Sequence, residues 1–178
     1  MENFKEKLTR VEAFVFDVDG VFTDGDIVPL ADGDFLRAYF ARDGYAVTYA
    51  ISEGYRVYII TGGRGKTLEH RFRMLKVTGL SSNVGDKCAA ITELAEREGL
   101  DLSNVVYMGD DIPDLGAMRM VGLPVCPADA CHEVTDAAIY VSQYAGGRGC
   151  VRDIIEQVLR AQGKWMLHTN GMHTVQSN

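Results

Sequence analysis

Short apolar runs alternate with amphipathic stretches along this chain, and this alternation restricts its fold more than any other feature. Buried strands are predicted at residues 11–18, 55–60, 105–108, 123–125 and 138–141, and helices at residues 44–53, 66–75, 86–98, 114–120 and 151–162. Strands that alternate with helices form parallel β-α-β units. The sequence therefore predicts an α/β fold built on a doubly wound parallel sheet.

A pair of short extended runs interrupts the alternation at about residues 26–40. The runs flank Ala31-Asp32-Gly33-Asp34, and Asp-Gly between such runs predicts a β-hairpin. An isolated two-stranded ribbon is unstable in water. The hairpin is therefore expected either to pack on its own domain or to pair with copies of itself.

The length of 178 residues suits one domain with a sizeable core. We expect that domain at residues 1–167, followed by a flexible polar tail at residues 168–178. No apolar run is long enough to span a bilayer, and the first seven residues lack the apolar core of a signal peptide. No membrane partner and a cytoplasmic location are expected.

The charge and the cysteines exclude other classes of protein. The net charge of −7 leaves no basic stripe that could displace counterions from phosphates, which argues against nucleic acid as a partner. No zinc-like spacing relates the cysteines to the four histidines. We expect reduced, mostly buried thiols at Cys88, Cys126, Cys131 and Cys150.

Polar residues gather where three predicted strands end. Ligands of open parallel sheets bind beyond the carboxyl ends of the strands. Several carboxylates at one edge would repel one another unless a hard cation neutralised them, and Mg²⁺ suits such oxygen ligands. Taken singly, each residue could equally be a helix cap, a turn former or a solvated charge. The residues concerned are Asp17, Asp19, Thr61, Gly62, Asp110, Asp111 and Asp114.

Four segments of the chain resemble, in order, the four motifs of the haloacid dehalogenase superfamily of phosphatases. They are D-V-D-G-V-F-T-D at residues 17–24, Thr61-Gly62, Lys87, and G-D-D-I-P-D at residues 109–114. The complete set spans most of the chain and is far more specific than a lone D-x-D. The resemblance implies a Rossmann-like core and a magnesium-dependent phosphatase.

The resemblance also implies a role for each motif residue. Asp17 would attack phosphorus and form an aspartyl-phosphate, while Asp19 would act as general acid and then as general base. Thr61 would donate its hydroxyl to a phosphoryl oxygen, and Lys87 would neutralise the phosphoryl charge. The magnesium ligands would be Asp17, the backbone carbonyl of Asp19 and Asp110, with Asp111 and Asp114 behind them or as alternative ligands.

The intervals between the motifs are too short for a cap domain. A bare site would admit water, so another part of the assembly should cover it. The capless members that this chain resembles are homotetramers in which neighbouring subunits complete the active site. We therefore expect a homotetramer, with the hairpin as the assembling element.

Three further segments resemble the phosphatases of 3-deoxy-D-manno-octulosonate 8-phosphate, a sugar-acid phosphate of lipopolysaccharide biosynthesis. They are the run at residues 41–45, Arg71 and the run G-G-R-G-C-V-R-D at residues 146–153. A sugar acid that carries a carboxylate and a phosphate needs cations at both ends. The candidate substrate-binding residues are Gly62, Arg42, Asp43, Gly44, Arg64, Arg71 and Arg148.

One departure from the family pattern leaves the substrate open. Arg usually follows Thr-Gly directly, whereas this chain has Gly63 and then Arg64. The Glu-Lys pair typical of the nine-carbon phosphatases is absent, which favours the eight-carbon substrate over a nonulosonate 9-phosphate. The remote alternatives are a receiver-like signalling module and a scaffold that lacks turnover. Asp19, which is suited to activating water, argues against the receiver.

Overall fold

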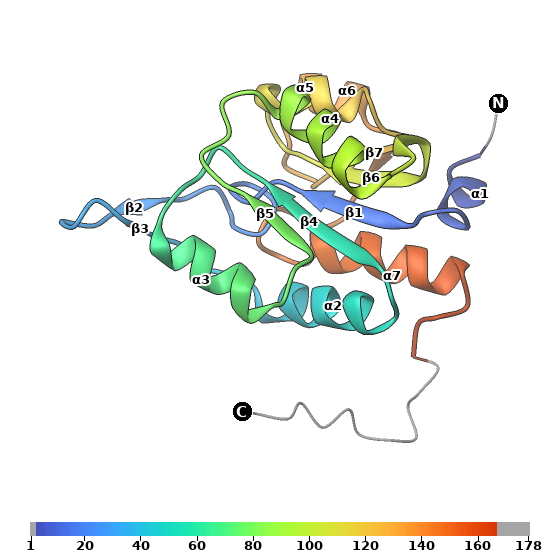
Figure 1. The fold of residues 1–178 in the computed structure, drawn as a ribbon, viewed down its shortest axis with the longest axis horizontal. Coiled ribbons are helices and arrows are strands. Elements are labelled where there is room, and N and C mark those ends of the chain that lie inside the picture. The colour runs from blue at the N-terminus through green and yellow to red at the C-terminus, as the bar shows by residue number, and fades with distance from the viewer. Residues whose placement is uncertain (1–2, 167–178) are drawn as a thin grey trace.

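The computed structural model describes residues 3–166 and contains a six-stranded parallel sheet (Figure 1). The strand order is β5-β4-β1-β6-β7-β8, and every neighbouring pair is parallel. The strands are β1 Ala13–Phe16, β4 Arg56–Ile60, β5 Gly79–Ser81, β6 Val105–Met108, β7 Leu123–Cys126 and β8 Tyr140–Val141. The central position of β1, between β4 and β6, brings the ends of these three strands together.

Helices cover both faces of the sheet, so the fold has three layers (Figure 1). One face carries α2, α3 and α7, and the other carries α4, α5 and α6. The helices are α1 Phe4–Leu8, α2 Ala41–Ser52, α3 Lys66–Met74, α4 Lys87–Glu98, α5 Leu115–Met118, α6 His132–Ala137 and α7 Cys150–Ala161, with short 3-10 turns at Leu102–Asn104 and Ile112–Asp114. The predicted doubly wound α/β class is confirmed.

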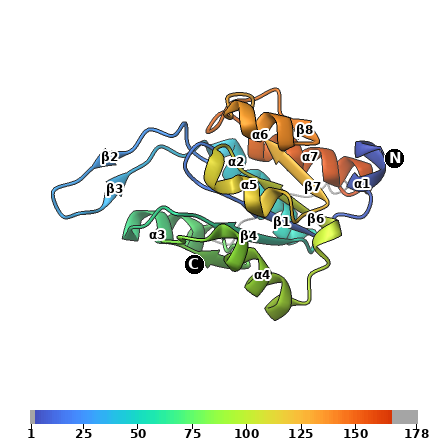
Figure 2. The same ribbon diagram turned by 90° about the horizontal axis from the view of Figure 1, so that it is seen from above.

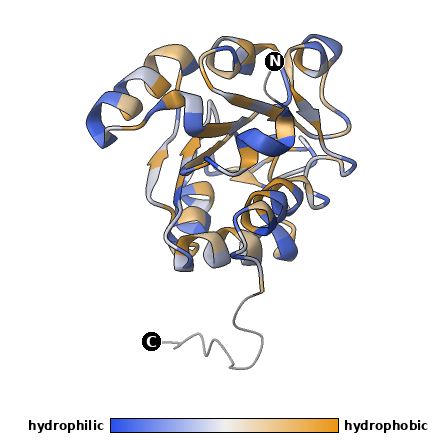
Figure 3. Ribbon diagram, turned by 90° about the vertical axis from the view of Figure 1, so that its right-hand side faces the viewer, coloured by the Kyte–Doolittle hydropathy of each residue, from blue (hydrophilic) through white to orange (hydrophobic). Residues whose placement is uncertain are grey.

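The strand β1 shows why the sheet is buried on both faces. Phe14 and Phe16 pack into the core below α2 and α7, whereas Ala13 and Val15 pack into the core below α4 and α5. Successive side chains of a strand point to opposite faces, so a strand covered on both sides is apolar throughout. Figure 3 shows the same pattern, with apolar strands inside and hydrophilic residues on the outer helix surfaces.

A β-hairpin projects from the body of the fold (Figure 2). It consists of β2 Val28–Pro29 paired antiparallel with β3 Phe35–Leu36. Asp34 fastens the hairpin to the start of α3, where its carboxylate accepts hydrogen bonds from the backbone N–H of Thr67 (3.1 Å) and from the Thr67 hydroxyl (3.2 Å). The cross-strand pair Val28 and Leu36 is 54% and 55% exposed. The hairpin therefore presents apolar surface to solvent.

The structure corrects several predicted boundaries. The second hairpin strand ends at Leu36 rather than at residue 40, because the chain turns toward the body at Arg37, which is buried. Helix α2 begins at Ala41, three residues before the predicted start. The sequence analysis missed α1, β5 and α6, which are short and, in the case of β5, lie at the sheet edge with little apolar patterning.

Two further expectations concern the cysteines and the chain ends. All four cysteines are free thiols, and Cys126 and Cys150 are buried. Within residues 3–166, no helix is both long and apolar enough to cross a membrane. The predicted tail at residues 168–178 lies outside the described residues, so the division into one domain and a tail stays a prediction.

Candidate active site

The loop after β1 carries the first two acids of the site. The backbone N–H of Asp17 donates to the carbonyl of Met108, at 3.0 Å, which holds the ends of β1 and β6 together. The chain then turns tightly, since the N–H groups of Phe22 and Thr23 both donate to the Val18 carbonyl. Gly20 has a φ of 84°, and a Cβ there would overlap the Asp110 carboxylate. Glycine is therefore required where this loop passes the end of β6.

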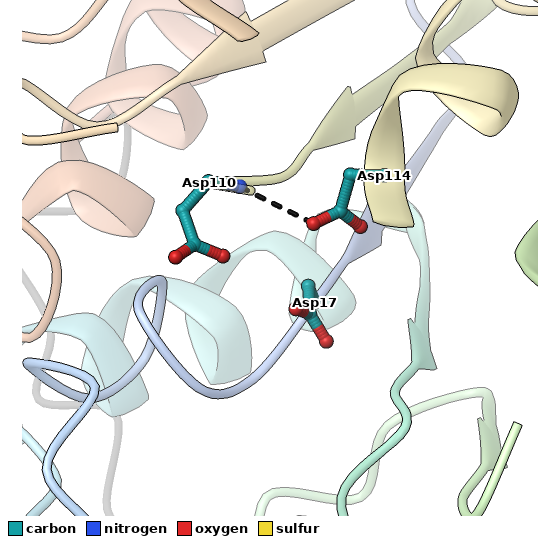
Figure 4. Close-up of side chains that lie close together, drawn as sticks. All are labelled: Asp17, Asp110 and Asp114. Carbon is teal, nitrogen blue, oxygen red and sulfur yellow. Dashed lines mark hydrogen bonds between the residues drawn. The ribbon is translucent and has the colours of Figure 1, made fainter. Parts of the chain in front are cut away.

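Asp17, Asp110 and Asp114 form a compact acidic cluster (Figure 4). One carboxylate oxygen from each lies within 4.8 Å of the other two. Burial is the largest cause that raises the pKa of Asp17 to about 6 and that of Asp110 to about 7, and the neighbouring carboxylates raise both further. Among the described residues, the buried Oδ1 of Asp17 has no hydrogen-bond partner. The cluster has the oxygen donors and the charge that a hard divalent cation requires.

Lys87 is the buried cation of the cluster. Its Nζ lies 2.9 Å from Asp17 Oδ2 and 2.6 Å from Asp114 Oδ1. Burial by itself would lower the pKa of Lys87, but the charges of Asp17 and Asp114 outweigh burial and raise it. Asp86 caps α4 by accepting from the N–H groups of its first turn, which fixes Lys87 at the helix start. The ammonium group is therefore held, charged, beside Asp17.

Asp114 organises the cluster and has few oxygen lone pairs left for a metal ion. Its Oδ1 accepts from Lys87 and also from the hydroxyl of buried Tyr107, at 2.8 Å. Its Oδ2 accepts from the backbone N–H groups of Asp110 and Asp111, at 3.3 and 3.5 Å. These contacts favour a supporting role for Asp114 behind the metal ligands. Tyr107 was missed by the sequence analysis because it occupies an ordinary core position of a strand.

Thr61 and Gly62 complete the site at the end of β4. Thr61 is buried, and its Oγ1 accepts a hydrogen bond from the backbone N–H of Gly63, at 3.0 Å. A single cleft of about 470 Å³ is lined by every motif residue that the strand-end pattern selected. Those residues are Asp17, Asp19, Thr61, Gly62, Asp110, Asp111 and Asp114, and Lys87, which the family resemblance selected, lines the same cleft.

Arg37 is the second residue of this region that the sequence analysis missed. Its Nε donates to Asp19 Oδ1 at 2.7 Å, and its Nη2 donates to Asp19 Oδ2 at 3.0 Å. The hydrogen bond to Asp19 is the largest cause that raises the pKa of Arg37. Arg37 lies beyond the hairpin, 18 residues from Asp19 in the sequence, so no local pattern could have paired them.

The candidate substrate-binding residues separate into two groups. Arg64 lines a second hollow of about 290 Å³, which shares Asp19, Gly62 and Gly63 with the main cleft. The other five line neither hollow: Arg42, Asp43, Gly44, Arg71 and Arg148. The structure therefore brings Gly62 and Arg64 to the site of this chain and leaves the others outside it.

The buried carboxylate of Asp43 binds the start of α7 and does not line the cleft. Its Oδ1 accepts from the backbone N–H of Arg152, at 2.8 Å, in the first turn of that helix. Burial raises the pKa of Asp43 to about 6. Gly44 allows the guanidinium of Arg71 to approach, because a Cβ there would overlap Arg71 Nη2. Arg71 in turn lies over the ring of Tyr39, 5.4 Å from its centroid.

The run at residues 146–149 supports the loop that follows Asp17. A Cβ at Gly146 would overlap the carbonyl of Gly20, and the N–H of Gly147 donates to the Val21 carbonyl at 2.9 Å. Arg148 is exposed, and its Nη2 lies 3.4 Å from Asp24 Oδ2. The two glycines therefore let this run pack directly against residues 20–24.

The fold and the strand-end acids define a haloacid dehalogenase-like hydrolase, and the family model of that description matches residues 76–154. The chain is 39% identical over 158 residues to the 3-deoxy-D-manno-octulosonate 8-phosphate phosphatase KdsC of Escherichia coli K12, with 89% of this chain and 84% of that protein covered. The chain belongs to the family of these phosphatases.

Solved structures agree with this assignment. The 3-deoxy-D-manno-octulosonate 8-phosphate phosphatase of Yersinia pestis has a TM-score of 0.87 and 38% identity, and covers 90% of this chain and 86% of its own. The Moraxella catarrhalis phosphatase of the same name, in complex with magnesium, phosphate and KDO, has a TM-score of 0.86 and 30% identity, with coverages of 89% and 91%. A Haemophilus influenzae relative is cobalt-bound, with a TM-score of 0.86, 30% identity and coverages of 89% and 92%.

Proposed function

We propose that this protein is a magnesium-dependent phosphatase that releases inorganic phosphate from 3-deoxy-D-manno-octulosonate 8-phosphate, in lipopolysaccharide sugar biosynthesis. The observation that carries the proposal is the single cleft in which Asp17, Asp19, Thr61, Lys87 and Asp110 meet. The 39% identity to KdsC supports the substrate. The free thiols fit a reducing compartment, and we propose a cytoplasmic location.

Magnesium fits the acidic cluster. Asp17 and Asp110 offer carboxylate oxygens with no competing hydrogen bond at Asp17 Oδ1, and the backbone carbonyl of Asp19 is the third ligand in our proposal. Asp111 and Asp114 stand behind them. When bound, Mg²⁺ neutralises the carboxylates and withdraws charge from the phosphoryl group.

The first half of the reaction is attack by Asp17. A carboxylate oxygen of Asp17 forms a bond to phosphorus while the bond between phosphorus and the sugar oxygen breaks, which leaves an aspartyl-phosphate. Lys87 keeps Asp17 ionised and offsets the phosphoryl charge, and the Thr61 hydroxyl and Gly62 backbone N–H donate to phosphoryl oxygens. Asp19 gives its proton to the departing sugar oxygen.

The second half returns the enzyme to its starting state. Asp19, now a carboxylate, accepts a proton from water as the water oxygen attacks phosphorus. The bond between phosphorus and Asp17 breaks, inorganic phosphate leaves, and Asp17 is again a free carboxylate. Both halves use the same phosphoryl position, so one set of donors serves twice.

The sugar acid extends, in our proposal, into the second hollow. That hollow begins at Asp19, where the leaving oxygen must lie, and Arg64 lines it. A guanidinium is suited to a carboxylate. The exposed Arg42 and Arg148 are candidates for contacts with substrate held by a neighbouring subunit, and Asp43, Gly44 and Arg71 for shaping that surface.

We further propose a homotetramer in which neighbouring hairpins cover the clefts. The support is the apolar surface of the hairpin, where Ile27, Val28 and Leu36 are about half exposed or more. Burying such residues against another subunit is favourable at roughly 25 cal/mol per Å² of apolar surface. A cover over the cleft would also exclude water from the aspartyl-phosphate.

A kinetic panel tests the proposed function. The panel compares phosphate release from the 8-phosphate, a nonulosonate 9-phosphate and simple sugar phosphates, each with and without Mg²⁺. We expect the highest kcat/KM for the 8-phosphate and no release after chelation of the metal. A higher kcat/KM for the 9-phosphate would show that the substrate is a nonulosonate 9-phosphate and not the 8-phosphate. No turnover of any compound would overturn the enzymatic function.

A further inference from the structure

The guanidinium of Arg37 makes a bidentate contact, which we call the fork, with the carboxylate of Asp19. Two guanidinium nitrogens donate to the two carboxylate oxygens, at 2.7 and 3.0 Å. The third, Nη1, donates to the backbone carbonyl of Arg64 at 3.4 Å. The Arg37 side chain is only 2% exposed, and its guanidinium lies 5.6 Å from the centroid of the Phe35 ring. Fork-to-fork pairs of this kind fix direction as well as distance.

We propose that Arg37 is a positioning residue that aims the Asp19 carboxylate at the leaving oxygen of the substrate. The proposal rests on the proposed function, in which Asp19 transfers the proton. Asp19 lies in a loop beyond the sheet, so no strand pairing fixes its side chain. Within residues 3–166, the hydrogen bonds to its carboxylate come from Arg37.

Gly63 supplies an independent observation. A Cβ at this position would lie 3.0 Å from Arg37 Nη2, 3.0 Å from Asp19 Oδ2 and 3.1 Å from Thr61 Oγ1. The absence of a side chain therefore lets the fork lie against the backbone of the loop after β4. The glycine that departs from the usual family pattern stands where the pair between Arg37 and Asp19 needs space.

The chemistry of the first half-reaction gives this pair a function. As the bond between phosphorus and the sugar oxygen breaks, its electron pair stays on that oxygen, which takes the proton of Asp19. The carboxylate that remains is the group that the Arg37 fork is shaped to bind. A carboxylate free to rotate would spend less time within reach of the leaving oxygen, and proton transfer would slow.

The competing interpretation is that Arg37 only fastens the hairpin. The hairpin has a second fastening, Asp34 to Thr67, that does not touch Asp19. Asp34→Ala therefore loosens the hairpin and leaves the contact between Arg37 and Asp19 intact. The two interpretations predict different results for the same pair of variants.

The test compares two leaving groups. The alkoxide of a sugar phosphate must be protonated as it departs, whereas p-nitrophenolate leaves as a stable anion. General acid catalysis contributes about 10²- to 10⁴-fold, so we expect Arg37→Met to lower kcat/KM for the 8-phosphate by about 10- to 100-fold. For p-nitrophenyl phosphate, which needs no acid, the expected loss is below about threefold.

Controls separate positioning from general damage. Arg37→Lys keeps the charge but loses the fork, and we expect it to restore only part of the lost activity. Asp34→Ala should change kcat/KM by the same factor for both substrates. Arg97 is an exposed arginine on α4, and Arg97→Met should have the kcat/KM of the unaltered protein for both substrates. An equal loss of kcat/KM for the 8-phosphate and for p-nitrophenyl phosphate in Arg37→Met would overturn the proposal.

The proposed function and this inference can fail separately. No hydrolysis of the 8-phosphate by the unaltered protein would overturn the proposed function alone. The inference is then decided by crystal structures of the Arg37→Met and Asp34→Ala variants. We expect the Asp19 carboxylate to turn to another rotamer in the first variant and to keep its direction in the second. An unchanged Asp19 carboxylate in Arg37→Met would overturn the positioning role.

Discussion

The acidic cluster and the hairpin are opposite kinds of structure within one short chain. Asp17 and Asp110 follow central strands, Asp114 ends a short 3-10 turn, and buried Lys87 at the start of α4 pairs with Asp17 and Asp114. The hairpin has two residues in each strand and leaves Leu36 55% exposed. All residues of the cluster come from a single chain, whereas apolar side chains of the hairpin remain exposed to solvent. The ends of the sheet strands therefore carry the acidic cluster, whereas the covering of the cleft by a hairpin is our proposal.

The largest expected effect tests whether the cluster works through Asp17 itself. Asp17→Asn removes the proposed nucleophile with little change in shape, so we expect kcat to fall by at least about 10⁴-fold. Mass spectrometry of the quenched reaction should find no aspartyl-phosphate. Asp136→Asn, an exposed acid on α6, is the matched control. Substantial turnover by Asp17→Asn would show that another group attacks phosphorus.

Lys87→Met should damage both activity and stability. It leaves Asp17 and Asp114 buried without their cation, and breaking a buried pair costs about 3–5 kcal/mol of the free energy of unfolding. Loss of the proposed contact between Lys87 and the phosphoryl group should lower kcat by about 10²-fold or more. Urea unfolding and phosphate release measure the two effects. A variant as stable as the parent would mean that the cluster is less tightly built than the contacts indicate.

Magnesium should reverse the pH dependence of stability. Burial raises the pKa of Asp17 to about 6 and that of Asp110 to about 7, from an ordinary value of 3.8. The folded state therefore binds these protons more tightly than the unfolded chain, so without metal these two groups lower the free energy of unfolding as pH rises from about 4 to about 7. Because Mg²⁺ binds the deprotonated carboxylates, its stabilising effect should grow over the same window.

Thermal unfolding across this window, with and without Mg²⁺, measures the effect. Asp110→Asn removes one titrating ligand and should flatten the difference between the two curves. A magnesium effect that is constant from pH 4 to pH 7 would show that the ion binds elsewhere.

The smallest expected effect on the fold comes from the hairpin. Leu36→Asp changes an exposed residue, so we expect the free energy of unfolding of a subunit to change by less than about 0.5 kcal/mol. The proposed homotetramer should nevertheless dissociate, because a charge would be buried at the proposed contact. Light scattering gives the mass of the particle. Met74→Asp, at an apolar position on α3 that is 62% exposed, is the control, and equal behaviour of the two variants would remove the hairpin from the contact.

The amino-acid sequence by itself determined the α/β class and placed the acids, Thr61 and Gly62 at the ends of strands, whereas Lys87 was selected by its resemblance to a family motif. The reason is local: strand periodicity places a residue at the end of its strand, and the parallel order of strands brings those ends to one edge. The positions of residues such as Asp17 and Asp110 can therefore be predicted from the residues next to them in the sequence.

Only the tertiary structure decided which residues support the cleft. Arg37 reaches Asp19 because the chain turns back after the hairpin, and Tyr107 reaches Asp114 from a core position. Asp43, a predicted substrate-binding residue, accepts from the backbone N–H of Arg152 in the first turn of α7. These contacts join segments whose separation in space depends on the path of the whole chain, so no local pattern specifies them.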